Sequence, residues 1–134
     1  EKELSLIREK IQAKGILFSL FIDPELAQVD ASQRIGADSV EFNTGKYTEL
    51  ETPEEIEAEL ERLKIAAKRA AEKGLRVFAG HGLNYDNVKP IAAIPEIEEL
   101  NIGHFIVGQA IYIGMENAVI EMIRTIKMGR AQKS

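Results

Sequence analysis

The sequence contains no cysteine, so disulfide bonds, thiolate metal sites and a cysteine nucleophile are all excluded. Its longest apolar runs are a handful of residues, far short of the roughly 20 that a membrane-spanning helix needs. The amino-terminal residues Glu1 to Leu4 show a charged helical pattern that is unlike a signal peptide. We therefore expect a cytoplasmic protein that does not associate with membranes.

Nucleotide-binding and metal-binding patterns are also missing. Neither GxxxxGK(S/T) nor GxGxxG occurs, so a nucleotide site is not expected. The two histidines, His81 and His104, are not spaced as HxH or HxxxH, which argues against a metal site. The net charge of −5 argues against a nucleic-acid partner, because phosphate backbones bind basic surfaces. A small anionic ligand is still compatible, since main-chain amides at helix N-termini bind phosphate on acidic proteins.

The 134 residues, 45% hydrophobic and 29% charged, are typical of one globular domain or part of a larger one. Hydrophobic spacing alternates along the chain between that of helices and that of buried strands. Gly15, Gly36 and Gly74 each lie between a helical pattern and the apolar run that follows it. The spacing predicts helices over 2–14, 24–35, 53–73, 86–94 and 115–127 with a frayed tail after 129, and strands over 16–22, 39–42 and 75–79.

Capping residues indicate where two of these helices begin. Asp23 followed by Pro24 predicts a carboxylate cap with proline in the first helical position. Thr52, Pro53 and Glu55 form a capping box with proline at its first position.

Two stretches of the sequence are predicted to contain strands. The run 16–22 is almost continuously apolar, which predicts a strand covered on both faces. The stretch 98–110 supports two assignments: either Leu100–Ile102 is a strand and a short helix begins near His104, or Phe105–Val107 is a strand that Gly108 ends. Periodicity does not decide between them, because both runs are short.

The order of elements is one helix followed by four strand–helix units, with no hairpin signal between strands. Such alternation predicts an α/β fold with a parallel sheet and right-handed crossovers. Four strands make either a small open sheet or half of a (β/α)₈ TIM barrel. In both architectures ligands bind at the carboxyl ends of the strands.

Polar residues follow the expected strands at those ends. His81, between two glycines after the third strand, is the leading candidate for a general acid or base. Glu41 lies inside the run Val40-Glu41-Phe42 and is a second candidate for proton transfer. Gly103-His104 offers main-chain amides for a phosphate, and Gly108-Gln109-Ala110 would do so under the other strand assignment. The alternatives are a plain turn at His81, a strand carboxylate paired with a cation at Glu41, and an ordinary strand-to-helix turn at Gly103.

Several blocks together resemble the pyridoxine 5′-phosphate synthase family. They are SLFID at 19–23, EFNTG at 41–45, AGHGL at 79–83, VKPIAAIP at 88–95 and ELNIGH at 99–104. The blocks are collinear over essentially the whole chain. The resemblance implies the C-terminal half of a TIM barrel, covering residues 1–134 as a single or partial domain with the family's strands five to eight.

The resemblance also implies an activity. The family condenses 1-deoxy-D-xylulose 5-phosphate with 3-amino-2-oxopropyl phosphate to pyridoxine 5′-phosphate, phosphate and water in vitamin B6 biosynthesis, without metal or organic cofactor. His81 would be the proton donor, Glu41 an active-site glutamate, and Gly82, Gly103 and His104 would hold the aminoketone phosphate. We expect the chain alone to lack full activity and to need the missing N-terminal half, from the same or a second polypeptide, in a homo-oligomer that is an octamer in the family.

The sequence departs from the family pattern at three positions. Asn43 stands where the family usually has histidine, Phe78 where it has asparagine, and Gln109 where it has arginine. Two rival interpretations stay open: another phosphate-binding barrel enzyme such as an isomerase or aldolase, and a non-catalytic half-barrel or doubly wound α/β binding domain. Lack of binding to a phosphate ester would favour the non-catalytic interpretation over the enzymes.

Overall fold

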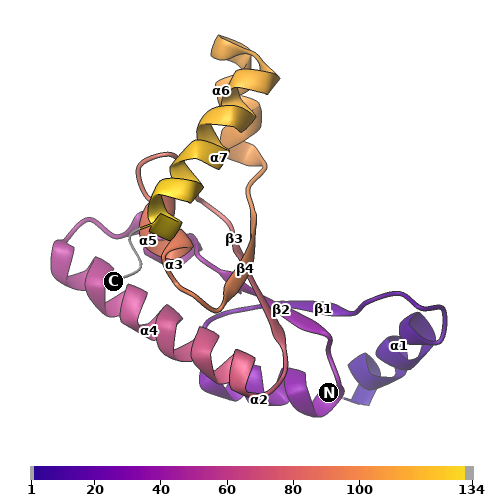
Figure 1. Cartoon of the computed structure of the whole chain (residues 1–134). Coiled ribbons are helices and arrows are strands. Elements are labelled where there is room, and N and C mark those ends of the chain that lie inside the picture. The colour runs from indigo at the N-terminus through magenta and orange to yellow at the C-terminus, as the bar shows by residue number, and fades with distance from the viewer. Residues whose placement is uncertain (1, 132–134) are drawn as a thin grey trace.

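The computed structural model describes residues 2–131, which form a four-stranded sheet with helices around it (Figure 1). The strands are β1 (Ser19–Ile22), β2 (Ser39–Asn43), β3 (Arg76–Gly80) and β4 (Ile97–Asn101). The helices are α1 (Lys2–Gln12), α2 (Leu26–Ile35), α3 (Gly45–Glu49), α4 (Pro53–Glu72), α5 (Val88–Ala92), α6 (His104–Ile113) and α7 (Met115–Ala131). Within the described residues, no helix combines the length and apolarity that crossing a membrane requires.

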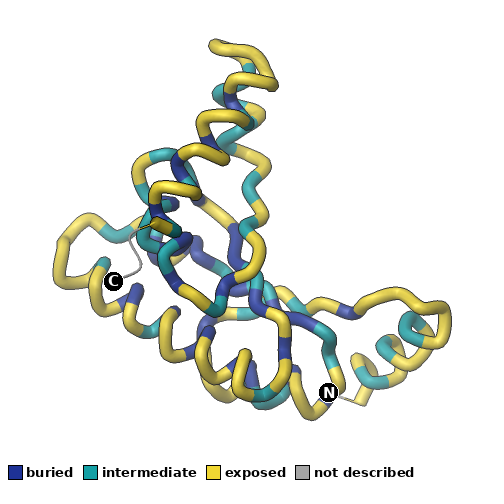
Figure 2. Tube along the Cα trace, in the orientation of Figure 1, coloured by how far each residue is buried: buried dark blue, intermediate teal, exposed yellow. Residues whose placement is uncertain are grey.

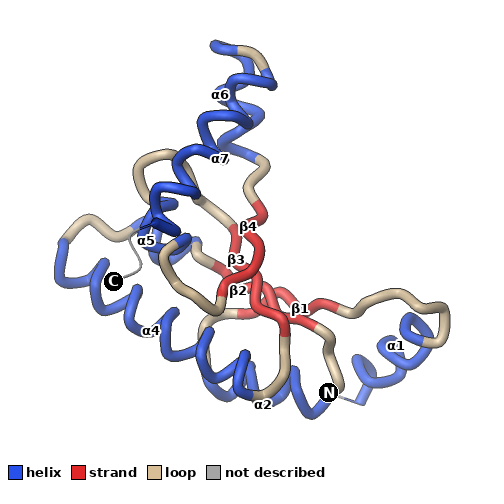
Figure 3. Tube along the Cα trace, viewed as in Figure 1, coloured by secondary structure: helices blue, strands red, loops and turns tan. Residues whose placement is uncertain are grey.

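The strands all run parallel and lie in the order β1-β2-β3-β4 (Figure 3). Helices connect successive strands, because parallel pairing requires the chain to return to the same end of the sheet each time. Four parallel strands alternating with helices are the arrangement of part of a (β/α)₈ barrel, so the predicted fold class is confirmed. The assignment of residues 1–134 to the C-terminal half in particular stays a prediction.

One face of the sheet carries the core. Val40, Val77 and Ala79 are at most 1% exposed and belong to one cluster with the apolar stripe of α4. Figure 2 shows the buried residues concentrated where the strands meet the neighbouring helices. Side chains alternate between the two faces of a strand. The opposite face carries Phe21, which is 57% exposed and is paired in register with Glu41 on β2.

The strand predicted over 16–22 is therefore corrected in two respects. Only Ser19–Ile22 pairs, and its side chains alternate between exposed and half-buried instead of being covered on both faces. The reason is that β1 is an edge strand of the described sheet, with β2 as its one paired neighbour there, and its Phe21 face points away from the helical layer. β4 forms the opposite edge.

The longest helix, α4, begins as predicted with Thr52 as its N-cap, and the described contact of the Glu55 carboxylate is with the Thr52 hydroxyl. The Thr52 hydroxyl accepts a hydrogen bond from the Glu55 amide at 3.3 Å and lies 2.6 Å from the Glu55 carboxylate, while Pro53 begins the helix. Leu63, Ala66 and the rest of its apolar stripe are buried against the sheet. Local capping and a 3.6-residue apolar period therefore suffice to place this helix.

The helix predicted after Asp23 begins later than expected. Its N-cap is Glu25, without a side-chain capping bond, and Asp23 lies in the preceding turn. There the Asp23 carboxylate accepts a 3.3 Å hydrogen bond from the Asn43 amide, at the carboxyl end of β2. The capping prediction for Asp23 was wrong, because a tertiary partner across the strand end engages the carboxylate instead.

Other boundaries also differ from prediction. The short helix α3 follows β2 directly and was not predicted, whereas α5 is shorter than the predicted 86–94. In the ambiguous stretch, the first assignment is confirmed: β4 ends at Asn101 and α6 begins at His104, so Phe105–Val107 is helical and not a strand. The last helix continues past Gly129 to Ala131, where a frayed tail was predicted, and 132–134 lie outside the described residues.

A carboxylate at the amino end of the sheet ties α1 to the strands. Asp38 accepts hydrogen bonds from the Phe18 amide at 2.7 Å and the Gln12 side chain at 2.9 Å, both through Oδ2. These bonds, the main-chain one first, hold the pKa of the Asp38 carboxyl below its ordinary value of 3.8. Because the folded-state pKa is lowered, ionised Asp38 stabilises the fold fully above its unfolded pKa and loses this effect as the pH falls through the folded pKa.

We expect Asp38→Ala to lower the free energy of unfolding at neutral pH by about 1–2 kcal/mol, since the Phe18 amide loses its acceptor. The difference from the unsubstituted chain should shrink in acid, below pH 3.8. Urea unfolding followed by circular dichroism at several pH values measures both effects. As control, Glu57→Ala removes an exposed ion pair, 3.5 Å from Lys64, and should change stability by less than about 0.5 kcal/mol. A pH-independent Asp38→Ala difference would contradict the assignment.

Candidate active site

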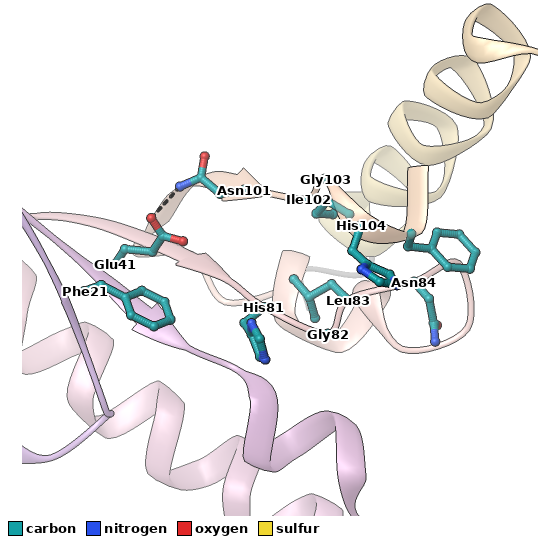
Figure 4. Close-up of a pocket in the computed structure, with 11 residues that line it drawn as sticks. Phe21, Glu41, His81, Gly82, Leu83, Asn84, Asn101, Ile102, Gly103 and His104 are labelled. Carbon is teal, nitrogen blue, oxygen red and sulfur yellow. Dashed lines mark hydrogen bonds between the residues drawn. The ribbon is translucent and has the colours of Figure 1, made fainter. Parts of the chain in front are cut away.

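A cavity of about 600 Å³ lies at the carboxyl ends of the strands (Figure 4). Its lining includes the five residues predicted for catalysis and substrate binding, which come from β2 and from the segments that follow β3 and β4. The structure thus brings together Glu41, His81, Gly82, Gly103 and His104. Its remaining lining residues are Phe21, Leu83, Asn84, Asn101, Ile102 and Phe105.

Glu41 projects from the middle of β2 into this cavity. Its carboxylate accepts a 2.8 Å hydrogen bond from the Asn101 side-chain amide, and Figure 4 shows the two groups turned toward each other. The strand between them makes room: a Cβ at Gly80 would lie 2.5 Å from the Glu41 carboxylate and 2.7 Å from the Asn101 carbonyl. Glu41 is thus held by an amide, not by the lysine or arginine of the alternative reading, and one carboxylate oxygen has no partner among the bonds described.

His81 follows β3 directly, and its backbone is unusual. Its φ of +86° makes it the one non-glycine residue between 2 and 131 with a positive φ. Such a conformation costs a non-glycine residue on the order of 1–3 kcal/mol, and it is found preferentially at functional sites. His81 is also exposed to the cavity, so its imidazole is accessible for proton transfer.

Gly103 and His104 form the beginning of α6. Gly103 is the N-cap and makes no side-chain capping bond, and the first turn of the helix carries no acidic residue. The amide of Val107 is already bonded to the Gly103 carbonyl, while the amides before it in the helix point toward its N-terminal end. A helix of this length with an uncapped N-terminus in a cavity suits an anionic group such as a phosphate.

The loop after Gly82 is braced by polar side chains that the sequence did not single out. The Tyr47 hydroxyl, on α3, donates to the Asn87 carbonyl at 2.8 Å, and burial raises the pKa of this phenol above its ordinary 10.0. Asn87 in turn donates from its side chain to the Gly82 carbonyl at 3.3 Å. The ring of Tyr85 packs edge-on against Phe105, with centroids 4.7 Å apart, which ties this loop to the start of α6.

Asn101 lines the cavity but was missed at the level of sequence. Asn101 belongs to a block that the resemblance included, but no local pattern pointed to its side chain. Only the sheet register could have pointed to it. Asn101 pairs with Gly80 on β3, and β3 pairs in turn with β2, which carries Glu41. Asn43, one of the departures from the family pattern, accepts from the Gly45 amide at 2.9 Å and donates to Asp23. It shapes the turn after β2.

The other two residues that depart from the family pattern are Phe78 and Gln109, and the structure describes both. Phe78 lies on the same face as Glu41 and under the Arg76 guanidinium, 5.0 Å from the ring centroid. Gln109 is half-buried inside α6. As for metals, no cluster of three or more His, Asp or Glu side chains able to hold an ion occurs among residues 2–131.

Comparison with known proteins identifies the family of this chain. A family model described as "Pyridoxal phosphate biosynthesis protein PdxJ" matches residues 1–128. The chain belongs to the PdxJ family. A relative from a Sulfurihydrogenibium species, named pyridoxine 5′-phosphate synthase, is 52% identical over 122 residues, which are 91% of this chain and 50% of the relative.

Further PdxJ relatives give the same picture. The pyridoxine 5′-phosphate synthase of Chlorobium luteolum is 48% identical over 125 residues, covering 93% of this chain and 53% of the relative. The pyridoxine 5′-phosphate synthase of a Synechocystis species is 52% identical over 114 residues, which are 85% of this chain and 47% of the relative. The chain therefore spans about half the length of the curated relatives that it matches.

We expect Gly80→Ala to disturb the site by forcing the Glu41 carboxylate and Asn101 apart, since the added methyl would overlap both. The variant should lose about 1–3 kcal/mol of unfolding free energy, as overpacking does, and the NMR signals of the Asn101 side-chain amide should shift.

The matched control for this substitution is Gly108→Ala. Gly108 lies inside α6 with nothing within 4 Å of an added Cβ, so alanine there should stabilise the helix by up to about 1 kcal/mol. Equal effects of the two substitutions would contradict the crowding seen at Gly80.

Proposed function

We propose that this chain supplies half of a pyridoxine 5′-phosphate synthase. The reaction condenses 1-deoxy-D-xylulose 5-phosphate with 3-amino-2-oxopropyl phosphate to give pyridoxine 5′-phosphate, phosphate and water. The observation that carries the proposal is the joint placement of Glu41, His81 and the uncapped N-terminus of α6 around one cavity. Its support is the family, since relatives about half identical to the chain carry the name of this enzyme.

Each residue has a role that its surroundings suit. His81, exposed in the cavity, donates a proton to the reacting substrate. Glu41, with one oxygen engaged by Asn101, keeps another oxygen available to accept a proton or to face a developing positive charge. The main chain at Gly82 and Gly103, together with His104, binds the phosphate of the aminoketone substrate. Imine formation, phosphate elimination, water addition and ring closure all require proton transfers of this kind.

The second half of the barrel is a further part of the proposal. β1 and β4 are edges of the described sheet, and unpaired parallel edges readily take up another strand. The face that carries Phe21 is the one that would point into a closed barrel, so a polypeptide completing the barrel would cover it. That polypeptide is either the rest of the same protein or a second chain.

Assembly into a homo-oligomer is proposed as well. The end of α6 presents Ile111 and Tyr112, which are 81% and 84% exposed. Large apolar side chains that are this exposed side by side are typical of protein–protein contacts. Size-exclusion chromatography with light scattering would determine the number of copies.

The function is tested by reconstitution. We expect the chain alone to form no pyridoxine 5′-phosphate, because it carries only part of the barrel. Co-expression with the part of the Sulfurihydrogenibium relative that the chain does not cover should restore product formation, measured by chromatography of the reaction mixture. Turnover by the chain alone would contradict the need for a second half. A stable complex without turnover would contradict the proposed activity.

In the reconstituted enzyme, we expect His81→Asn to lower kcat by about 100-fold to 10,000-fold, the usual contribution of a positioned general acid. Asparagine tolerates a positive φ better than most residues, so the fold should be preserved. Lys64→Ala, on the exposed side of α4, serves as the control and should leave kcat unchanged. A His81→Asn enzyme with full activity would remove His81 from the mechanism.

A further inference from the structure

Thr44 lies directly beneath the turn that carries His81. It is 0% exposed and follows the last residue of β2. Its hydroxyl oxygen is 2.8 Å from the Gly80 carbonyl oxygen and 2.6 Å from that of His81. These two carbonyls flank the Cα atom of His81, so a single buried hydroxyl contacts the backbone on both sides of it.

The main chain reinforces this contact. The Thr44 amide donates to the Gly80 carbonyl at 2.8 Å, which continues the pairing of β2 with β3 by one residue beyond the strand. The hydroxyl has one proton, which it shares between the two carbonyl oxygens as a donor. The turn is thereby held from its buried side, whereas the imidazole is on the exposed side.

The conformation that is held in this way is the unfavourable one. His81 has a φ of +86°, and Gly82 after it has +75°. Glycine adopts a positive φ without strain, but a residue with a Cβ does so only where its surroundings enforce it. The Thr44 hydroxyl is the one polar group among the described contacts that bonds to the His81 carbonyl, so it is the group placed to enforce this conformation.

The histidine ring is confined as well. A Cβ at Gly45 would lie 2.7 Å from Cδ2 of the His81 ring, so the ring lies directly against the main chain at the start of α3. The two consecutive residues after Asn43 therefore both adjoin His81: Thr44 contacts its backbone, and Gly45 leaves space for its ring.

We propose that Thr44 is a positioning residue for His81: its buried hydroxyl holds the His81 backbone in the left-handed conformation and so fixes the position of the imidazole at the edge of the cavity. The conformational part of this proposal stands on the contacts alone. Its kinetic part rests on the proposed function, because it takes His81 as the proton donor.

The conformational part is tested on the chain itself by a double-mutant cycle. Thr44→Val removes the hydroxyl but keeps the shape, and His81→Gly removes the need to enforce a positive φ. We expect Thr44→Val to lower the urea midpoint of unfolding markedly in the unsubstituted chain and by clearly less in the His81→Gly chain. Equal losses in both backgrounds would overturn the proposal, since Thr44 would then only fill its buried site.

Thr125→Val is the matched control for the cycle. Thr125 is also buried, at 8% exposure, and its hydroxyl donates to the Glu121 carbonyl at 2.8 Å within α7, far along the chain from His81. Its substitution should lower the midpoint by the same amount whether residue 81 is histidine or glycine. Coupling between Thr125 and His81 as large as that of Thr44 would also overturn the proposal.

The kinetic part is tested in the reconstituted enzyme. We expect Thr44→Val to lower kcat by about tenfold to a hundredfold, because a small misplacement of a catalytic group costs that much. KM should change little, and Thr44→Ser, which keeps the hydroxyl, should restore most of the rate. An unchanged kcat, or no rescue by serine, would contradict the role. If the unsubstituted reconstituted enzyme is inactive, the proposed function fails while the cycle on the isolated chain still decides the conformational part.

Discussion

The in-register parallel pairing of β2 with β3 is the constraint on which the rest of the structure depends. It places Asn43 beside Gly80, so the turns that follow the two strands begin at the same level and contact each other. The next pairing places Asn101 beside Gly80 and within reach of Glu41. A slip of one strand by one residue would turn the side chains of that strand to the opposite face of the sheet. Main-chain hydrogen bonding between the strands therefore decides which side chains line the cavity.

Small residues at the strand ends make room for the polar ones. Gly80 leaves space for Glu41 and Asn101, and Gly45 leaves space for the ring of His81. His81 itself has a positive φ, a backbone conformation that glycine adopts without strain. A fold optimised for stability alone would not combine an exposed, strained histidine with a buried hydroxyl contacting its carbonyl. Such local conflicts with stability are typical of functional sites, where the surrounding structure has to maintain them.

The proposed phosphorylated substrates would meet an electrostatic conflict in this chain, since its net charge is −5. The described site resolves the conflict locally. The first turn of α6 has no acidic side chain, and its uncapped main-chain amides provide the positive end of a helix dipole. Membership of the PdxJ family gives this arrangement a context, and the chain spans about half the length of the curated relatives that it matches.

The sequence by itself determined the local elements and the residue types of the site. The N-cap at Thr52, the glycines after three of the helices and the apolar runs act over one or two turns, so α4 and the alternation of strands and helices could be predicted. What it did not determine depends on residues far apart in the chain. Asp23 bonds to Asn43 instead of capping a helix, Asn101 bonds to Glu41 across 60 residues, and Thr44 reaches His81 across 37. Only the tertiary structure decided these contacts, because strand register and the packing of neighbouring turns, not any local pattern, bring their atoms together.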